Sequence, residues 1–358
     1  MSAVVKDWDA FQILAPPLDG ARPLKSLRRG QAVSAGEKLA LDPRPGHGDL
    51  HAPASGLIEE INELEIVIRR DEEAVGRPPE ALDLGRLPPG DLAAAVKGLG
   101  LDLPPQPAGT PLIVNTLKAE PGLDLAPALF GERRETLAAG LEAAARLWPA
   151  AKIIWAVARA GEAPAESDFR LIRAAYPHGL PALVKKKITG QSDPRGLGVR
   201  GGRELYLLGR IWRTGRPLTA MPLTLGGANY FVPLGARVAD LLSFANLVPG
   251  PDDLIVLNGL VRGRTLGRLN RGLGLSAAAL HLVRNGGRPG PAAPCRHCGQ
   301  CGRACPVSLP VEALAAEEPR EWLKEAGPRL AGCLLCGLCA LVCPAGRPLM
   351  DMIRLKAG

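Results

Sequence analysis

The sequence has few aromatic residues and lacks long hydrophobic runs. Phe, Trp and Tyr supply only 4% of its 358 residues, which disfavours one large aromatic-lined pocket. No stretch of about 18 apolar residues occurs, and Met1–Pro17 lacks the basic and apolar regions of a secretory signal peptide. We therefore expect a cytoplasmic protein, which could lie peripherally at the inner face of the cell membrane.

Dense basic segments are also lacking, although the formal net charge is +8. Nucleic-acid surfaces combine clustered Lys and Arg with aromatic side chains, and the sequence has no such cluster. The short run Lys185–Lys187 is interpreted as a solvated face. We therefore expect no nucleic-acid partner.

Length and turn residues indicate several ordered modules. A chain of 37.6 kDa is too long for one small core, so three or four modules are expected. Gly and Pro, with 43 and 35 residues, stay below the roughly 25–30% that is typical of low-complexity chains. The predicted fold class is a multidomain α+β protein.

Residues 1–70 have the pattern of a small β-structured domain. Short β-type runs between residues 30 and 68 alternate with Gly, Pro and Ser. The pattern resembles the barrel-sandwich hybrid of biotinyl and lipoyl carriers, but no lysine stands in the tripeptide setting that those carriers modify. A scaffold is therefore expected, and His47 and His51 are interpreted as surface or capping residues.

Residues 71–190 are predicted to form an α/β domain. Asp91 is a candidate N-cap for its first helix, and Ser167 or Asp168 for its last. Strand, helix and strand in succession form a βαβ unit of a parallel sheet. Apolar periodicity gives five elements: helix 90–97, strand 111–115, helix 132–147, strand 152–157 and helix 167–175.

Residues 191–290 are predicted to form a β-rich module. The segment 215–248 contains β-type runs around a Gly-Gly turn, and its part 237–247 has a helical pattern. From about Pro294 the composition changes abruptly, which places a last domain at 291–358.

All eight cysteines lie in this last domain, in two copies of the run C-x2-C-x2-C-x3-C-P. Each cysteine of the second copy follows its counterpart by 38 positions. Such runs ligate 4Fe-4S clusters, and in two-cluster proteins the fourth cysteine of each run binds the other cluster. The predicted ligand sets are Cys295, Cys298, Cys301 and Cys343 for one cluster, and Cys333, Cys336, Cys339 and Cys305 for the other.

Zinc and disulfides are the alternatives for these thiols. Zinc modules commonly use two separated C-x2-C pairs and need no proline-terminated quartet, and disulfides are rare in a reduced compartment. Helical patterns at 311–316 and around Trp322 favour an α-helical ferredoxin module. His297, inside the first run, is interpreted as a passive exposed imidazole, with a hydrogen bond to a cluster sulfur as the alternative.

Taken in order, the modules resemble the C subunit of the Rnf-type electron-transport complex, a family similar to the flavin-bearing subunit of respiratory complex I. The resemblance covers most of the chain and implies a barrel-sandwich hybrid, a flavodehydrogenase-like α/β domain, a β-grasp module of the soluble-ligand-binding (SLBB) type and a two-cluster ferredoxin domain. Besides the cysteine runs, it is carried by Val33–Gly36, His51–Gly56, Ala119–Gly122, Tyr176–Gly179, Ile188–Gly190 and Asn229–Gly235.

One departure from the family concerns its flavin and NADH site. The family has a Gly-Gly-Ala-Gly-Phe-Pro-Thr loop whose bare backbone approaches a phosphate, whereas this chain has the proline-rich segment Leu101–Thr110. Proline lacks the N–H donor, leucine obstructs the backbone, and Asp102 repels a phosphate. The Glu120-Pro121 pair is retained. We therefore expect a degenerate domain that binds neither FMN nor NADH tightly and serves as a docking scaffold.

The leading functional hypothesis is an electron-transfer subunit with two 4Fe-4S clusters. It would relay single electrons between a soluble donor or partner oxidoreductase and a membrane-associated or flavin-bearing redox complex, whose other subunits would be its partners. We expect a redox subunit rather than a free-standing enzyme, since no Walker A or catalytic-triad motif occurs. Two alternatives stay open: an NADH- or corrinoid-linked flavin oxidoreductase, and a structural adaptor whose clusters only staple the fold.

Overall fold

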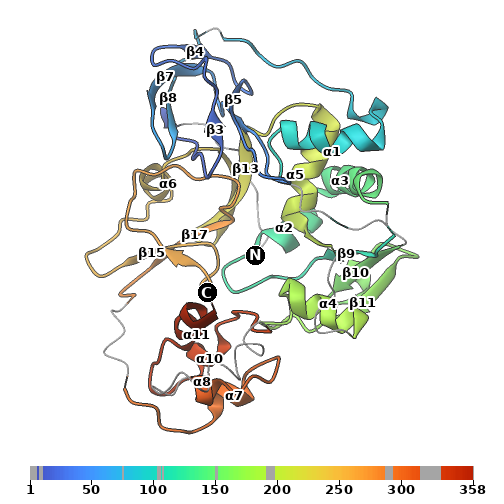
Figure 1. Cartoon of the computed structure of the whole chain (residues 1–358), viewed down its shortest axis with the longest axis vertical. Coiled ribbons are helices and arrows are strands. Elements are labelled where there is room, and N and C mark those ends of the chain that lie inside the picture. Colours follow the sequence, from blue (N-terminus) through green and yellow to red (C-terminus); the bar gives the residue numbers. More distant parts are fainter. Residues whose placement is uncertain are drawn as a thin grey trace.

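The computed structural model describes residues 6–7, 11–74, 76–102, 106, 109–149, 152–190, 198–286, 293–314 and 332–357. Over these ranges the chain forms four sheets, a set of helices beside one of them, and a C-terminal group of short helices (Figure 1). The molecule is thus a multidomain protein that mixes α and β structure, as the sequence predicted.

The N-terminal part consists of two small sheets with a common hydrophobic core. Their strand orders are β2-β8-β7-β4 and β3-β5-β6. Ile58, Ile66 and Ile68 are buried between them, because alternate side chains of a strand face the same side. The strands are β2 Ile13–Leu14, β3 Arg22–Pro23, β4 Ala32–Val33, β5 Lys38–Leu41, β6 Leu50–His51, β7 Gly56–Ile61 and β8 Ile66–Arg70.

Two polar residues near this part differ from their predicted roles. His51 is 3% exposed rather than at the surface, because it ends β6 and its ring faces Gly100. Burial lowers the pKa of His51 to about 4, so the ring is neutral near pH 7. Asp91 lies in the first turn of helix α1 (Pro89–Gly98) but does not cap it, since Pro88 occupies the N-cap position.

The α/β part is a parallel sheet with the strand order β11-β10-β9-β12. The predicted βαβ unit is confirmed, although its helix begins at Arg134 and a separate helix precedes it. The fourth strand follows residue 198, so this sheet extends past the domain boundary that was predicted at 190. The elements are β9 Leu112–Asn115, α2 Leu125–Glu132, α3 Arg134–Leu147, β10 Ile153–Val157, β11 Asp168–Leu171, α4 Pro181–Thr189, β12 Val199–Gly201 and α5 Gly202–Thr214.

The helix predicted over 167–175 is wrong, because Asp168–Leu171 form the edge strand β11. The sequence Asp-Phe-Arg-Leu alternates polar and apolar residues, which is the period of a strand rather than of a helix. β11 pairs in parallel with β10, and all four of its side chains are exposed. An exposed edge position explains why its apolar signal is weak.

Helices α3 and α5 cross closely at two glycines. A Cβ atom at Gly140 would lie 2.0 Å from the carbonyl oxygen of Leu205, and one at Gly209 would lie 1.8 Å from that of Thr136. Any side chain at either position would push the helices apart. This crossing therefore fixes α5, and with it the end of β12, against the rest of the domain.

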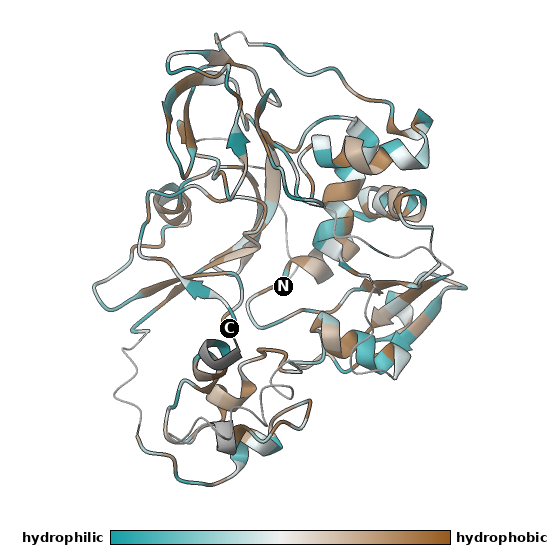
Figure 2. Cartoon of the chain, in the orientation of Figure 1, coloured by the Kyte–Doolittle hydropathy of each residue, from teal (hydrophilic) through white to brown (hydrophobic). Residues whose placement is uncertain are grey.

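The third part is a mixed sheet with the order β1-β14-β13-β17-β15-β16. A helix, α6 (Val238–Phe244), lies within the predicted range 237–247. In Figure 2 the strands of this sheet are largely hydrophobic, in agreement with a buried core that includes Met221, Leu223 and Val232. The strands are β1 Lys6–Asp7, β13 Ala220–Leu225, β14 Ala228–Pro233, β15 Leu254–Leu257, β16 Arg264–Thr265 and β17 Ala279–Val283.

The C-terminal part contains the cysteines and four short helices in its described ranges. They are α7 Gln300–Arg303, α8 Val311–Leu314, α10 Leu338–Leu341 and α11 Leu349–Ala357. The predicted helix at 311–316 is present over Val311–Leu314 as α8, while residues 315–316 and Trp322 lie outside the described residues. Leu309, Val311, Leu349 and Ile353 pack together with cysteine side chains in a small separate core. Across the described ranges of the chain, no helix has the length and apolar character needed to cross a membrane.

Candidate metal centres

The two cysteine runs fold into the same backbone shape. Helices α7 and α10 each follow a glycine in the left-handed conformation, Gly299 with φ 66° and Gly337 with φ 75°. Two residues earlier, His297 and Leu335 are also left-handed, with φ 49° and 48°. The duplicated sequence therefore gives duplicated turns, and the first three cysteines of each run line one cavity.

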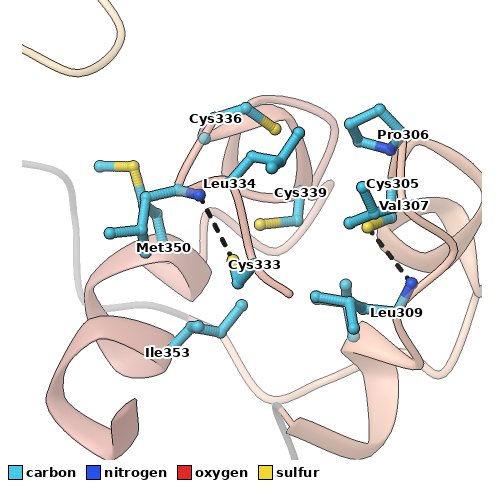
Figure 3. A pocket seen from close by; sticks show the side chains of 13 residues that line it. Cys305, Pro306, Val307, Leu309, Cys333, Leu334, Cys336, Cys339, Met350 and Ile353 are labelled. Atoms are coloured by element: carbon cyan, nitrogen blue, oxygen red, sulfur yellow. Dashed lines mark hydrogen bonds between the residues drawn. The ribbon is translucent and has the colours of Figure 1, made fainter. Parts of the chain in front are cut away.

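One set of thiols lines a cavity that we call the inner cavity (Figure 3). Its volume is about 360 Å³, open solvent included, and aliphatic side chains such as Leu309 and Ile353 cover the space between the sulfur atoms. Its four thiols are those of Cys305, Cys333, Cys336 and Cys339.

The other set lines a second cavity, the outer cavity, of about 370 Å³. It contains more polar side chains, and its Cys298 is exposed. Its four thiols are those of Cys295, Cys298, Cys301 and Cys343. Each cavity thus receives three thiols from one run and the fourth from the other, so the fold brings together the two sets proposed from the spacing. That these sets bind metal remains a prediction.

Backbone donors favour the thiolate form of these cysteines, and burial opposes it. The N–H of Leu335 donates to Sγ of Cys333 at 3.4 Å, and the N–H of Leu309 donates to Sγ of Cys305 at 3.3 Å (dashed in Figure 3). Burial raises the pKa of the Cys339 thiol to about 11. A metal must therefore displace protons to bind, and the resulting thiolates are ligands that suit iron-sulfur clusters. Four soft donors that line one mainly aliphatic cavity fit such a group.

His297 is exposed, as predicted, and its backbone rather than its ring contacts a thiol. The main-chain N–H of His297 donates to Sγ of Cys295 at 3.4 Å. The equivalent donor in the second run is Leu335. This hydrogen bond depends on the left-handed turn and not on the imidazole.

The inner cavity adjoins the rest of the molecule through contacts that the sequence did not reveal. The hydroxyl group of Tyr176 donates to the carbonyl oxygen of Cys336, and burial raises the pKa of this phenol. A Cβ atom at Gly337 would lie 2.8 Å from a methyl group of Val261. The motif Tyr-Pro-His-Gly was recognised in the sequence, but its contact with a residue 160 positions away was not predictable.

Glu120 is buried and binds another part of the chain. Its Oε2 atom accepts the backbone N–H of Arg262 at 2.9 Å, and the N–H of Leu260 donates to the carbonyl oxygen of Pro121 at 3.0 Å. Gly259 lies so close that a Cβ atom there would be 1.8 Å from the Glu120 carboxyl carbon. The retained Glu-Pro pair therefore anchors the loop 259–262 that follows β15.

At three strand ends of the parallel sheet, a side-chain oxygen atom accepts a hydrogen bond from a backbone N–H group. Asn115 accepts the N–H of Leu117 at 3.1 Å, and Glu162 accepts the N–H of Ala158 at 3.0 Å. Glu204 accepts the N–H of Gly201 at 3.3 Å. Such N–H groups are the ones that bind phosphates in open α/β sheets. Here, a side-chain oxygen atom accepts one such N–H at each of the three strand ends.

A wide cavity lies beside these strand ends, and no motif had indicated it. Its volume is about 1560 Å³, open solvent included, and Leu117, Phe130 and Trp155 contribute to an apolar wall. Lys118 at its edge forms an ion pair with Asp124. The position is one at which open parallel sheets commonly bind ligands.

Comparison with known proteins finds relatives among subunits of oxidoreductase complexes. The chain resembles the C subunit of ion-translocating oxidoreductase complexes, which confirms the resemblance inferred from the motifs. It is 28% identical over 349 residues to that protein of Pseudomonas aeruginosa, covering 81% of this chain and 44% of the relative. Identity to the Rhodobacter capsulatus protein is 26%, covering 81% and 66% of the two chains, and identity to the Erwinia tasmaniensis protein is 26%, covering 81% and 42%.

The chain thus spans between 42% and 66% of the length of these curated relatives. Among solved structures, an NAD+-reducing NiFe hydrogenase in its H2-reduced state aligns with a TM-score of 0.42 and 19% identity, over 70% of this chain and 57% of the other. Its air-oxidized state gives 0.41 and 20% over the same shares. No family model matches the chain.

Proposed function

We propose that the chain relays single electrons through two 4Fe-4S clusters. The observation that carries this proposal is the pair of separate cavities, each with four thiols in a three-plus-one arrangement from duplicated runs. Cys295, Cys298, Cys301 and Cys343 would hold one cluster, and Cys333, Cys336, Cys339 and Cys305 the other. The bound clusters supply one-electron redox chemistry. The protein positions them, and the backbone N–H groups of Leu335 and Leu309 donate to sulfur atoms of the inner set.

The class of redox partner follows from the resemblance. We infer that the chain works with other subunits of a redox complex, between a partner oxidoreductase and a membrane-associated or flavin-bearing component. A peripheral place at the cytoplasmic face of the membrane agrees with this role. The same resemblance supports identifying residues 1–70 as a barrel-sandwich hybrid and the mixed sheet around β13 and β14 as a β-grasp module.

We further propose that the α/β domain binds neither FMN nor NADH tightly. Glu162 and Glu204 satisfy backbone donors at the ends of β10 and β12, where a phosphate would otherwise bind. Glu120 is engaged by Arg262. A bound phosphate would have to displace these carboxylates and would meet their negative charge.

Stepwise reduction of anaerobically purified protein tests the relay. Dithionite should bleach the visible absorption of both clusters, and a one-electron acceptor should restore it, whereas NADH alone should leave the spectrum unchanged. Acid extraction should release no stoichiometric FMN. Bleaching by NADH alone, together with extracted flavin, would instead establish the flavin oxidoreductase alternative.

A further inference from the structure

The two cavities differ in polarity at four lining positions that the duplication makes equivalent. The 38-residue offset pairs each charged or polar residue of the outer cavity with an apolar residue of the inner one. The duplication thus allows the two cavities to be compared with each other, because their backbone conformations are similar and their lining charges differ. The pairs are Arg296 with Leu334, His297 with Leu335, Glu312 with Met350, and Arg347 with Leu309.

The two cavities also differ in burial, and the more polar outer cavity is the more exposed one. Cys298 of the outer cavity is exposed, whereas its equivalent, Cys336 of the inner cavity, is buried. The inner cavity also lies against the body of the molecule, where Tyr176 donates to the carbonyl oxygen of Cys336 and Val261 packs on Gly337. The outer cavity is therefore the one that faces solvent and an approaching partner.

Both differences favour an added electron at the outer cavity. Reduction adds one negative charge, which nearby cations stabilise and an apolar, buried environment disfavours. Arg296 and Arg347 line the outer cavity, and Glu312, with its Oε2 4.0 Å from Sγ of Cys301, acts against them. With His297 counted as neutral, one net positive charge remains, compared with none at the equivalent inner positions. The N–H of Leu309 favours reduction at the inner cavity, but one neutral donor is a weaker influence than a net charge.

We propose that Arg296 and Arg347 give the outer site a higher reduction potential than the inner site. This inference rests on the proposed function, because it requires a cluster in each cavity. A single electron taken up by the chain then resides at the outer site, next to the exposed Cys298. Transfer from the inner to the outer site moves that one electron without making or breaking a bond.

A redox titration of the full chain, followed by EPR under anaerobic conditions, tests the proposal. Two reduction steps are expected, with equilibrium constants that differ at least tenfold, which corresponds to about 59 mV for one electron. Arg296→Leu introduces the residue found at the equivalent inner position and should lower the constant of the higher-potential step about tenfold, leaving the other step unchanged. Arg354→Leu removes the same charge from an exposed residue that lines neither cavity and should shift neither step.

The reciprocal variant Leu334→Arg should raise the equilibrium constant of the lower-potential step. This variant tests the proposal if Arg296→Leu does not fold. Coincident steps in the unmodified protein, or an equal shift of both steps in either variant, would overturn the inference. Iron and sulfide are measured on every sample. A deficit of clusters in the unmodified protein refutes the proposed function itself, whereas two intact clusters of equal potential refute only the asymmetry.

Discussion

Replacing Glu120 by alanine should destabilise the chain by about 1.5–3 kcal/mol. The carboxylate is buried and accepts the backbone N–H of Arg262 at 2.9 Å, and hydrogen bonds that involve a charged group contribute roughly this amount. The truncation also leaves a cavity beside Gly259. Glu120→Gln keeps an oxygen acceptor at the same place and should cost about 1 kcal/mol or less.

Urea unfolding followed by circular dichroism measures these differences, with Glu142→Ala as the control because Glu142 is exposed on α3. Flavin content should be zero in all variants. If the free energy of unfolding of Glu120→Ala lies within about 0.5 kcal/mol of that of the control, then Glu120 does not anchor the loop 259–262. If Glu120→Ala lowers the content of a bound flavin, then Glu120 serves a ligand.

The close helix crossing and the buried histidine give two further predictions. Gly209→Ala should destabilise the chain by about 1–3 kcal/mol through overpacking, whereas Gly131→Ala, which has open space around it, should not; thermal unfolding distinguishes them. The folded-state pKa of His51 is about 4 and its ordinary value is 6.5, so the unfolded chain binds more protons between these pH values and stability falls as pH falls. His51→Gln should remove about 2–3 kcal/mol of the stability difference between pH 7 and pH 4.5, and an unchanged difference would contradict the burial of His51.

The cysteine runs were readable from sequence because their conformation is local. The spacing, together with Gly299 and Gly337 in left-handed turns, determines where the first three thiols of each run point. The βαβ unit was predictable for a similar reason, since its strands are apolar over several consecutive residues. Edge strand β11 was missed although its sequence alternates polar and apolar residues, because a run of four exposed residues carries little hydrophobic signal.

Contacts between segments that are distant in the sequence could not be predicted from the sequence alone. The burial of His51 depends on the segment around Gly100, and the role of Glu120 depends on a loop 142 positions later. The hydrogen bonds at the strand ends were also not predictable. Glu162 and Glu204 look like ordinary surface carboxylates in the sequence until their backbone partners are known. Motifs in the sequence identified several of the important residues, whereas their contacts depend on tertiary packing.

Chemical analysis of the anaerobically isolated chain tests the central claim most directly. Two four-iron clusters held crosswise by the eight thiols predict about eight irons and eight sulfides per polypeptide, and Cys343→Ala should reduce both numbers by about half by emptying only the outer cavity. Stoichiometric zinc, or an iron content far below this value in the unmodified protein, would contradict the account.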